Sequence, residues 1–416
     1  MNHILGYHCT LCNAEFPPLP ELMTCPHCGE TGILDIVYDY GVVKKHFSRE
    51  RLTGNRDNSM WRYAPLMPLR SPSAGGAEGL SDFLRIGWSP LYKSLRLGER
   101  LGLRTLYIKD DGINPTASLK DRASGVAVAK ALELGYDTIS CSSTGNAASS
   151  LAGNAARMGL KTVIFVPQRA PQGKVAQLLI FGANVISVAG DYRQTFELSK
   201  AAIEKWGFYN RNAGINPILT EGKKTVALEI AEQLHFAPTD WVAVSVGDGC
   251  TIGGVYNGFY DLLQLGMIER IPKILGVQST GCCPFVDAKG GPLVPTPENT
   301  IADSIAVGVP RNPVKAQRAV ANSGGTWLAV TDEDILATMR LLGAAEGVFG
   351  EPAGVTAAAG VARAIETGII RSNESVTVIS TGSGLKDVAN ALRAAGEPFL
   401  CEPSLEALER SGRVQS

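Results

Sequence analysis

Short apolar runs alternate with longer segments of helical periodicity along most of the chain beyond about residue 105. The runs are rich in β-branched residues, as strands buried on both faces of a parallel sheet are. Several helical segments end near a glycine, which is a common helix terminator. This alternation predicts an α/β fold with parallel sheets covered by helices. The expected strands are 105–109, 138–141, 162–166, 185–188, 242–246 and 376–380, and the expected helices are 121–134, 147–158, 172–181 and 195–205.

The first 40 residues lack this alternation and are rich in cysteine and proline. Their four cysteines form two Cys-x-x-Cys pairs that are twelve residues apart, and they are Cys9, Cys12, Cys25 and Cys28. Zinc favours four thiolates in a tetrahedron, and one ion that joins two such pairs stabilises a segment too short to bury its own core. Residues 1–40 therefore predict a zinc ribbon with a structural Zn²⁺. His8 and His27 lie beside the cysteines and are alternative ligands.

Composition narrows the classes of partner. The chain has 416 residues, 45% of them hydrophobic, which is enough for two or three domains with packed cores. Its formal net charge is −1, and the basic residues are spread along the chain, which argues against a nucleic-acid or anionic-membrane surface. The chain begins without a basic, then apolar, leader pattern and has no apolar run of about 18 residues. We therefore expect a cytoplasmic protein that binds small molecules.

One lysine stands where an expected strand passes into an expected helix. Strand 105–109 is followed by the turn Asn114-Pro115-Thr116 and then by Lys120 in the first helical turn. At a helix N-terminus the helix dipole and the nearby amides disfavour the ammonium form of a lysine. A lysine that sheds its proton can bond covalently to an aldehyde, although most lysines in a first turn are simply solvated.

Three further turns follow expected strands. Asn146 begins the helix after strand 138–141, where free amides can bind an anion, and it could equally be a simple helix cap. Residues 246–254 contain glycines whose N–H groups can converge on a phosphate. Residues 379–387 are again a strand end followed by glycines. Each turn alone is a weak signal, because many strand ends look similar.

Together these segments resemble the threonine synthase family of fold-type II pyridoxal-phosphate (PLP) enzymes. The segment Asn-Pro-Thr-Ala-Ser-Leu-Lys-Asp-Arg at 114–122 is similar to the family's Asn-Pro-Thr-Gly-Ser-Phe-Lys-Asp-Arg and departs at Ala117 and Leu119. By this resemblance Lys120 holds PLP covalently and moves protons during turnover. The resemblance also implies a tryptophan synthase beta-like fold with two three-layer α/β/α domains.

The resemblance assigns the cofactor contacts. The asparagine that matches Asn146 bonds the ring hydroxyl of PLP, residues 247–251 bind its phosphate, and Thr381 faces its pyridine nitrogen. A neutral hydroxyl at this nitrogen suits elimination and replacement chemistry. Asp248 places an acid near a phosphate, so we expect it to point away or to be protonated. The implied cofactor residues are Asn146, Gly247, Asp248, Gly249, Cys250, Thr251 and Thr381.

Threonine synthases convert O-phosphohomoserine and water to threonine and phosphate, so the resemblance implies a second anion site. Residues 211–225 are similar to the family's Asn-Ser-x-Asn-Pro…Glu-Gly-x-Lys-Thr, but Ile218-Leu219-Thr220 stand where relatives place an arginine. Arg211 is a candidate replacement, or a solvated surface arginine. The candidate substrate residues are Ser143, Thr144, Lys109, Arg211 and Asn216.

Departures from the family pattern keep other activities open. Ser383 stands where the family has histidine, and Trp88 replaces a glycine before Pro90 and is expected to narrow the pocket. Glu351-Pro352 is similar to a family step near the cofactor, and equally to a helix start. The alternatives are a cysteate synthase-like replacement on O-phosphoserine with sulfite, another elimination enzyme such as a serine/threonine ammonia-lyase, and a non-catalytic zinc-ribbon adaptor.

The sequence divides into four expected parts. Residues 1–40 form the ribbon, 41–119 with 216–400 a large PLP domain, 120–215 a small mobile α/β domain, and 401–416 a C-terminal tail. We expect PLP between the two α/β domains and a small phosphorylated amino acid as substrate. By resemblance the protein is a homodimer.

Overall fold

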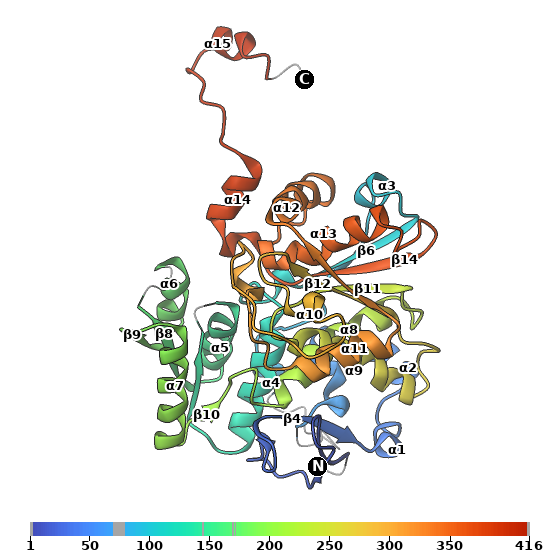
Figure 1. Cartoon of the computed structure of the whole chain (residues 1–416), viewed down its shortest axis with the longest axis vertical. Coiled ribbons are helices and arrows are strands. Elements are labelled where there is room, and N and C mark those ends of the chain that lie inside the picture. Colours follow the sequence, from blue (N-terminus) through green and yellow to red (C-terminus); the bar gives the residue numbers. More distant parts are fainter. Residues whose placement is uncertain (1–2, 70–79, 144, 169, 171, 414–416) are drawn as a thin grey trace.

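The computed structural model contains three separate sheets (Figure 1). It describes residues 3–69, 80–143, 145–168, 170 and 172–413. The N-terminal ribbon lies at one end of the molecule, and the C-terminal segment extends away from the opposite end. In the described residues, no helix is both long and apolar enough to span a bilayer.

The larger sheet has six strands, of which five are parallel and the edge strand β5 (Leu91–Lys93) is antiparallel. Its other strands, in spatial order, are β13 (Thr326–Val330), β12 (Lys273–Ser279), β11 (Trp241–Ser245), β14 (Ser375–Ser380) and β6 (Thr105–Asp110). All five residues of β11 are buried, as expected for a central strand covered on both faces. The helices of this part are α8 (Ile218–Gln233), α9 (Cys250–Gln264), α11 (Pro313–Asn322), α12 (Asp332–Glu346) and α13 (Pro352–Glu366).

The smaller sheet has four parallel strands, in the order β10 (Tyr209–Asn210), β7 (Thr138–Ser142), β8 (Lys161–Pro167) and β9 (Asn184–Val188). Its helices are α5 (Asn146–Arg157), α6 (Gln172–Ile180) and α7 (Tyr192–Trp206). The helix α4 (Lys120–Glu133) contacts α5 on one side and α8 on the other. It therefore links the two sheets.

The remaining elements are short. The ribbon is an antiparallel sheet in the order β2 (Glu15–Phe16), β1 (Ile4–Cys9), β4 (Gly29–Tyr38) and β3 (Thr24–Cys25). The connecting helices are α1 (Tyr40–Val43), α2 (Arg49–Thr53), η1 (Met60–Leu66), η2 (Leu80–Asp82), α3 (Leu97–Arg100), η3 (Asp111–Ile113), α10 (Pro284–Ala288), η4 (Asp303–Ile305), η5 (Gly384–Lys386), α14 (Val388–Ala395) and α15 (Leu405–Arg410).

The sequence predicted the α/β class and the parallel sheets, and both are confirmed. The boundaries differ where a cap was overlooked. The helix expected at 195–205 begins at residue 192, because Asp191 and Gln194 form a reciprocal capping box that satisfies its first amides. The helix expected at 121–134 includes Lys120 as its first residue.

Charged side chains from α8 hold the ribbon strand β4. The Tyr38 hydroxyl donates to Glu221 over 2.7 Å, and the Lys224 ammonium lies 4.0 Å from the Tyr38 ring centre. On the neighbouring helix α11, Lys315 pairs with Asp35 at 3.1 Å. Burial would raise the pKa of the Asp35 carboxyl, but the charges of Lys315 and Arg318 lower it. The ribbon is thus fastened to two helices of the large part.

A second buried network joins α4, α8 and β6. Arg122 donates to Asp111 at 2.6 Å and to Glu229 at 2.5 Å, and Lys109 donates to Glu229 at 2.7 Å. All four side chains are fully buried. Burial would raise the pKa of Glu229, but the charges of Arg122 and Lys109 lower it to about 2. A buried carboxylate between two cations is costly to remove, because both cations lose a partner.

We predict that Glu229→Gln lowers the free energy of unfolding by about 3–5 kcal/mol, measured by urea denaturation at pH 7. Because the folded-state pKa lies below the ordinary value of 4.5, the wild-type carboxylate stabilises fully above that pH and loses its effect as the pH falls toward 2. The variant should lack this pH-dependent component. As a control, Glu366→Gln removes an exposed pair with Arg363 and should change stability by less than about 1 kcal/mol. Equal losses of unfolding free energy in the two variants would contradict the stabilising role of the buried network.

Candidate active site

One cavity lies at the carboxyl ends of the parallel strands of the larger sheet, beside the first turns of several helices. Ligands of open α/β sheets bind at this edge, because the connecting turns there leave backbone groups free. The cavity is bordered by residues from β11 and β14 turns, from η4 and from the starts of α4, α5, α8 and α13. Those used below are Lys120, Asn146, Lys223, Gly247, Asp248, Gly249, Cys250, Thr251, Ser304, Ile305, Glu351 and Thr381.

Lys120 enters the cavity from the first turn of α4. A strained turn precedes it, because Ala117 has φ of +64°, a left-handed conformation that favours glycine. Backbone bonds hold the turn against the β14 loop: Leu119 donates to the Thr381 carbonyl at 2.8 Å. The side chain of Lys120 is only partly covered by protein atoms, because it borders the cavity.

The amine of Lys120 is close to losing its proton at neutral pH. Burial lowers its pKa to about 8, and the positive charge of Lys223 adds to this effect. Glu351 acts in the opposite direction, and Arg211 lowers the pKa further. A lysine with such a pKa supplies a free amine for covalent bonding without requiring alkaline conditions.

Three helix N-termini meet at the cavity without a side-chain cap. The residues before α4, α5 and α9 are Leu119, Gly145 and Gly249, and none of them caps its helix with a side-chain hydrogen bond. The first residue of each helix borders the cavity. Uncapped amides and aligned helix dipoles together favour a bound anion.

The turn after β11 is shaped so that its backbone faces the cavity. A Cβ at Gly247 would lie 2.8 Å from the Ile305 Cα, so a side chain there would collide with η4. Gly249 has φ of +89° and has no room either, since a Cβ would lie 2.6 Å from the Asn312 carbonyl oxygen. The Asp248 carboxylate accepts the Arg311 N–H at 2.7 Å, so this oxygen is turned toward the segment before α11.

A buried acid lies opposite the lysine. Asn146 donates its amide to Glu351 at 2.6 Å, and both side chains are buried at the cavity. Burial raises the pKa of Glu351 to about 7, aided by Asp303 and opposed by the Asn146 bond. The sequence signal for Glu351 was the Glu-Pro step, which was equally consistent with a helix start.

These features fit a phosphate-bearing aldehyde such as PLP. The free amine of Lys120 can bond the aldehyde. The backbone N–H groups of the glycine turn can donate hydrogen bonds to a phosphate, because Gly247 and Gly249 have no Cβ to block it. Thr381 and Asn146 add polar side chains from the other two turns. The structure therefore brings together Lys120 and all seven cofactor residues that the sequence predicted.

Of the substrate residues that the sequence predicted, the four that the structure describes do not border this cavity. Lys109 lies in the buried network, where it donates to the Ser89 carbonyl and to Glu229, both at 2.7 Å. Its ammonium is therefore not available to a substrate phosphate. Arg211 is fully buried rather than solvated, and it donates to the Ser124 hydroxyl at 3.0 Å. Its charge still reaches the cavity, because it lowers the pKa of Lys120 and of Lys223.

Two further candidates serve the backbone. Asn216 donates to the Asn210 carbonyl at 2.9 Å and accepts the Ile218 N–H at 3.2 Å, so it shapes the start of α8. Ser143 accepts the Gly145 N–H at 3.2 Å. Thr144 lies outside the described residues.

The departures from the family pattern have different surroundings. The Trp88 ring lies 4.1 Å from the Arg62 guanidinium and is not part of the cavity wall, so the expected narrowing is not seen there. Ser383 accepts the Leu385 N–H and begins η5. Leu219, in the segment Ile218-Leu219-Thr220 where relatives place an arginine, is fully buried.

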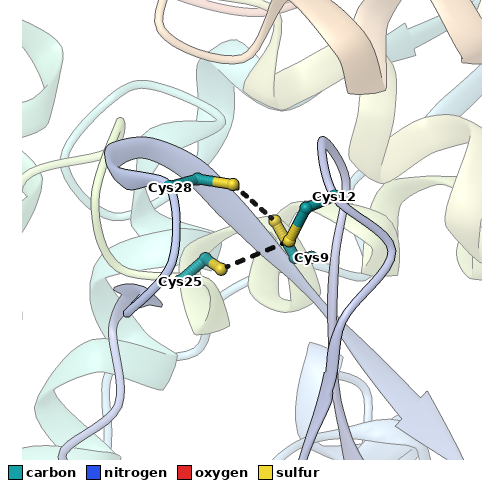
Figure 2. Close-up of side chains that lie close together, drawn as sticks. All are labelled: Cys9, Cys12, Cys25 and Cys28. Atoms are coloured by element: carbon teal, nitrogen blue, oxygen red, sulfur yellow. Dashed lines mark hydrogen bonds between the residues drawn. The ribbon is translucent and has the colours of Figure 1, made fainter.

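The four N-terminal cysteines form a cluster away from this cavity, and Figure 2 shows their sulfurs turned toward one another. The sulfur atoms all lie within 4.8 Å of each other, and Cys9 and Cys28 are 3.9 Å apart. The Leu11 N–H donates to the Cys9 sulfur at 3.4 Å, as in thiolate knuckles. This geometry can hold one tetrahedral ion. Among the residues described, the cluster contains cysteines alone.

Comparisons of sequence find relatives over nearly the whole chain. The profile of the family "pyridoxal-phosphate dependent enzyme" matches residues 83–382. Threonine synthases of Methanosarcina acetivorans and Methanocaldococcus jannaschii are each 38% identical, over 97% of this chain and 98% of each relative. The threonine synthase of Mycobacterium tuberculosis is 38% identical over 74% of this chain and 84% of its own length.

Comparisons of structure identify the same fold at lower identity. Threonine deaminase isoform 2 from Solanum lycopersicum has a TM-score of 0.64 at 23% identity, over 77% of this chain and 90% of the deaminase. Diaminopropionate ammonia lyase from Escherichia coli has a TM-score of 0.65 at 21% identity, over 76% of this chain and 89% of the lyase. The expected fold-type II architecture is thereby confirmed.

Proposed function

The chain belongs to the pyridoxal-phosphate dependent enzymes and, among them, to the threonine synthase family, and we propose that it converts O-phosphohomoserine and water to threonine and phosphate. The observation that best supports this is a group of buried cations: Lys120 and Lys223 border the cavity, and the charge of Arg211 acts on both of them. Lys120, Lys223 and Arg211 have no carboxylate within salt-bridge distance among the residues that the structure describes. Such a site requires anionic ligands, and both the cofactor and this substrate carry a phosphate.

Each cofactor contact that the resemblance implies has a residue in place to make it. Lys120 would hold PLP covalently, Asn146 its ring hydroxyl, the amides of 247–251 its phosphate, and Thr381 its ring nitrogen. When bound, PLP withdraws electrons from the carbon that loses its proton. Glu351 fixes the orientation of the Asn146 amide through their 2.6 Å bond.

Lys120 is the proposed base. Its Nζ takes the proton from the α-carbon of the substrate, and a pKa of about 8 leaves a useful fraction of free amine at neutral pH. An ordinary lysine, with a pKa of 10.5, would be almost entirely protonated. Burial is the largest cause of this low pKa, and the charges of Lys223 and Arg211 add to it.

We propose that the cysteine cluster binds a structural Zn²⁺. The support is the sulfur geometry and the four-thiolate donor set, which fills a tetrahedron and leaves no position for a substrate. The ribbon's strand β4 contacts the helices α8 and α11. Lys223 of α8 borders the cavity, and Asn312, just before α11, donates its N–H to the Asp248 carbonyl at 3.0 Å. Zinc would therefore also steady one wall of the active site.

Other features stay predictions. The division into a large domain and a small mobile domain at 120–215 is supported by the two separate parallel sheets, and closure of the small domain over substrate is our proposal. A homodimer rests on the resemblance alone, and a cytoplasmic location rests on the sequence pattern alone.

One observation favours a second candidate. Because Ile218-Leu219-Thr220 stand where relatives place an arginine and the described candidate side chains do not border the cavity, the substrate end differs from the family pattern. A phosphoserine-dependent replacement with sulfite, or an elimination on serine or threonine, would use the same cofactor residues and differ only there.

Product analysis tests the proposed function. Purified PLP-loaded enzyme should form threonine and phosphate in equal amounts from O-phosphohomoserine, as measured by amino-acid chromatography and phosphate release. The same enzyme should form no cysteate from O-phosphoserine and sulfite, and should release no ammonia from serine or threonine. Cysteate or ammonia without threonine would overturn the proposal in favour of the corresponding alternative.

Metal removal tests the ribbon's role. We predict that Cys9→Ser with Cys12→Ser removes the zinc, lowers the melting temperature and weakens PLP binding several-fold, because β4 no longer steadies α8 and α11. Metal content, calorimetry and PLP titration measure these effects. Cys401→Ser, at a cysteine outside the cluster, is the control and should change none of them. Zinc loss with unchanged stability and PLP affinity would contradict the proposed coupling.

A further inference from the structure

A lysine that the sequence did not single out borders the cavity. Lys223 lies near the start of α8, and its side chain is almost fully buried. Its neighbour Lys224 is equally buried but pairs with Glu221 at 2.5 Å and with Asp261 at 2.7 Å. Within the described part of the chain, Lys223 forms no such ion pair, and this difference requires a physical explanation.

Burying an ammonium without a counter-ion costs several kcal/mol. Burial lowers the pKa of Lys223, the Cys250 thiol opposes this, and Arg211 lowers the pKa again. Arg211 is itself buried, with the Ser124 hydroxyl as its acceptor. The protein therefore keeps one cation, Lys223, at the wall of the cavity and a second, Arg211, buried near it, and neither forms an ion pair with a carboxylate among the described residues.

The surroundings of Lys223 indicate the charge and shape of the missing anion. Lys223 lies beside Cys250, the first residue of the uncapped helix α9. The glycine turn before this helix offers backbone N–H groups, and Gly254 on α9 packs so closely that a Cβ would lie 3.1 Å from the Lys223 Cβ. An ammonium beside several free amides suits a phosphate, which accepts many hydrogen bonds at once.

We propose that Lys223 binds a phosphate monoester at this wall of the cavity. This inference deepens the proposed function and rests on its cofactor. The phosphate belongs either to PLP or to the substrate, and two binding measurements distinguish these sources.

The first measurement compares PLP with pyridoxal, which lacks the phosphate, by fluorescence titration of wild type, Lys223→Gln and Lys223→Arg. If Lys223 holds the cofactor phosphate, Lys223→Gln raises the Kd for PLP by about 10–100-fold and changes the Kd for pyridoxal by less than about twofold. Lys223→Arg keeps the charge and should recover most of the PLP affinity.

The second measurement titrates inorganic phosphate into the PLP-loaded proteins. If Lys223 holds the substrate phosphate, Lys223→Gln leaves the PLP affinity unchanged and weakens phosphate binding by about tenfold or more. Either result supports the inference. Unchanged PLP, pyridoxal and phosphate affinities in Lys223→Gln would overturn it.

A matched control separates binding from folding. Lys224→Gln removes the adjacent buried lysine, whose partners face the ribbon, so it should lower the melting temperature but leave the ratio of PLP to pyridoxal affinity unchanged. Lys223→Met should not lower the melting temperature of the cofactor-free protein, because it removes an unpaired buried charge. A lower melting temperature for Lys223→Met, with an unaltered affinity ratio and unaltered phosphate binding, would mean a purely structural role.

These readouts are independent of catalysis. Failure to form threonine would reject the proposed substrate but leave the binding measurements interpretable. Failure of wild-type protein to bind PLP would reject the proposed function and this inference together. The two failures are thus distinguishable.

Discussion

The active site depends on positive charge that the folded chain does not neutralise by itself. Lys120, Lys223 and Arg211 are gathered at the carboxyl ends of parallel strands, where three helix N-termini also point. Each of these groups raises the electrostatic potential in a poorly solvated cavity. This potential attracts phosphate, and it adds to burial, which is the larger cause, in lowering the pKa of the Lys120 amine.

Charges elsewhere in the interior are arranged in the opposite way. Arg122 and Lys109 share Glu229, and Lys315 pairs with Asp35 of the ribbon. These buried ions are neutralised by partners in distant parts of the sequence, and they fasten helices to sheets and to the ribbon. Paired ions thus build the scaffold, whereas Lys120 and Lys223, which border the cavity, have no carboxylate partner in the part of the chain that the structure describes.

Much of the site could be predicted from the sequence, because the carboxyl ends of parallel strands lie at the same edge of a sheet. Asn146, Thr381 and the glycine turn each come soon after an expected strand, so the topology alone brings such turns toward one edge. The same reasoning misplaced Lys109, which lies inside β6 and meets Glu229, 120 residues further along the chain. Long-range pairs of this kind leave no local pattern. The sequence also could not show which of Lys223 and Lys224 faces the cavity. Adjacent residues of a helix point in different directions around its axis, and the sequence does not give the rotation of the helix.

The covalent attachment point of PLP tests most directly whether Lys120 is the reactive lysine. Protein loaded with PLP is reduced with borohydride, digested, and mapped by mass spectrometry. We predict a pyridoxyl group on Lys120, because this lysine borders the cavity and its amine has a pKa of about 8. A label on Lys223 or on another lysine, or no label at all, would contradict it.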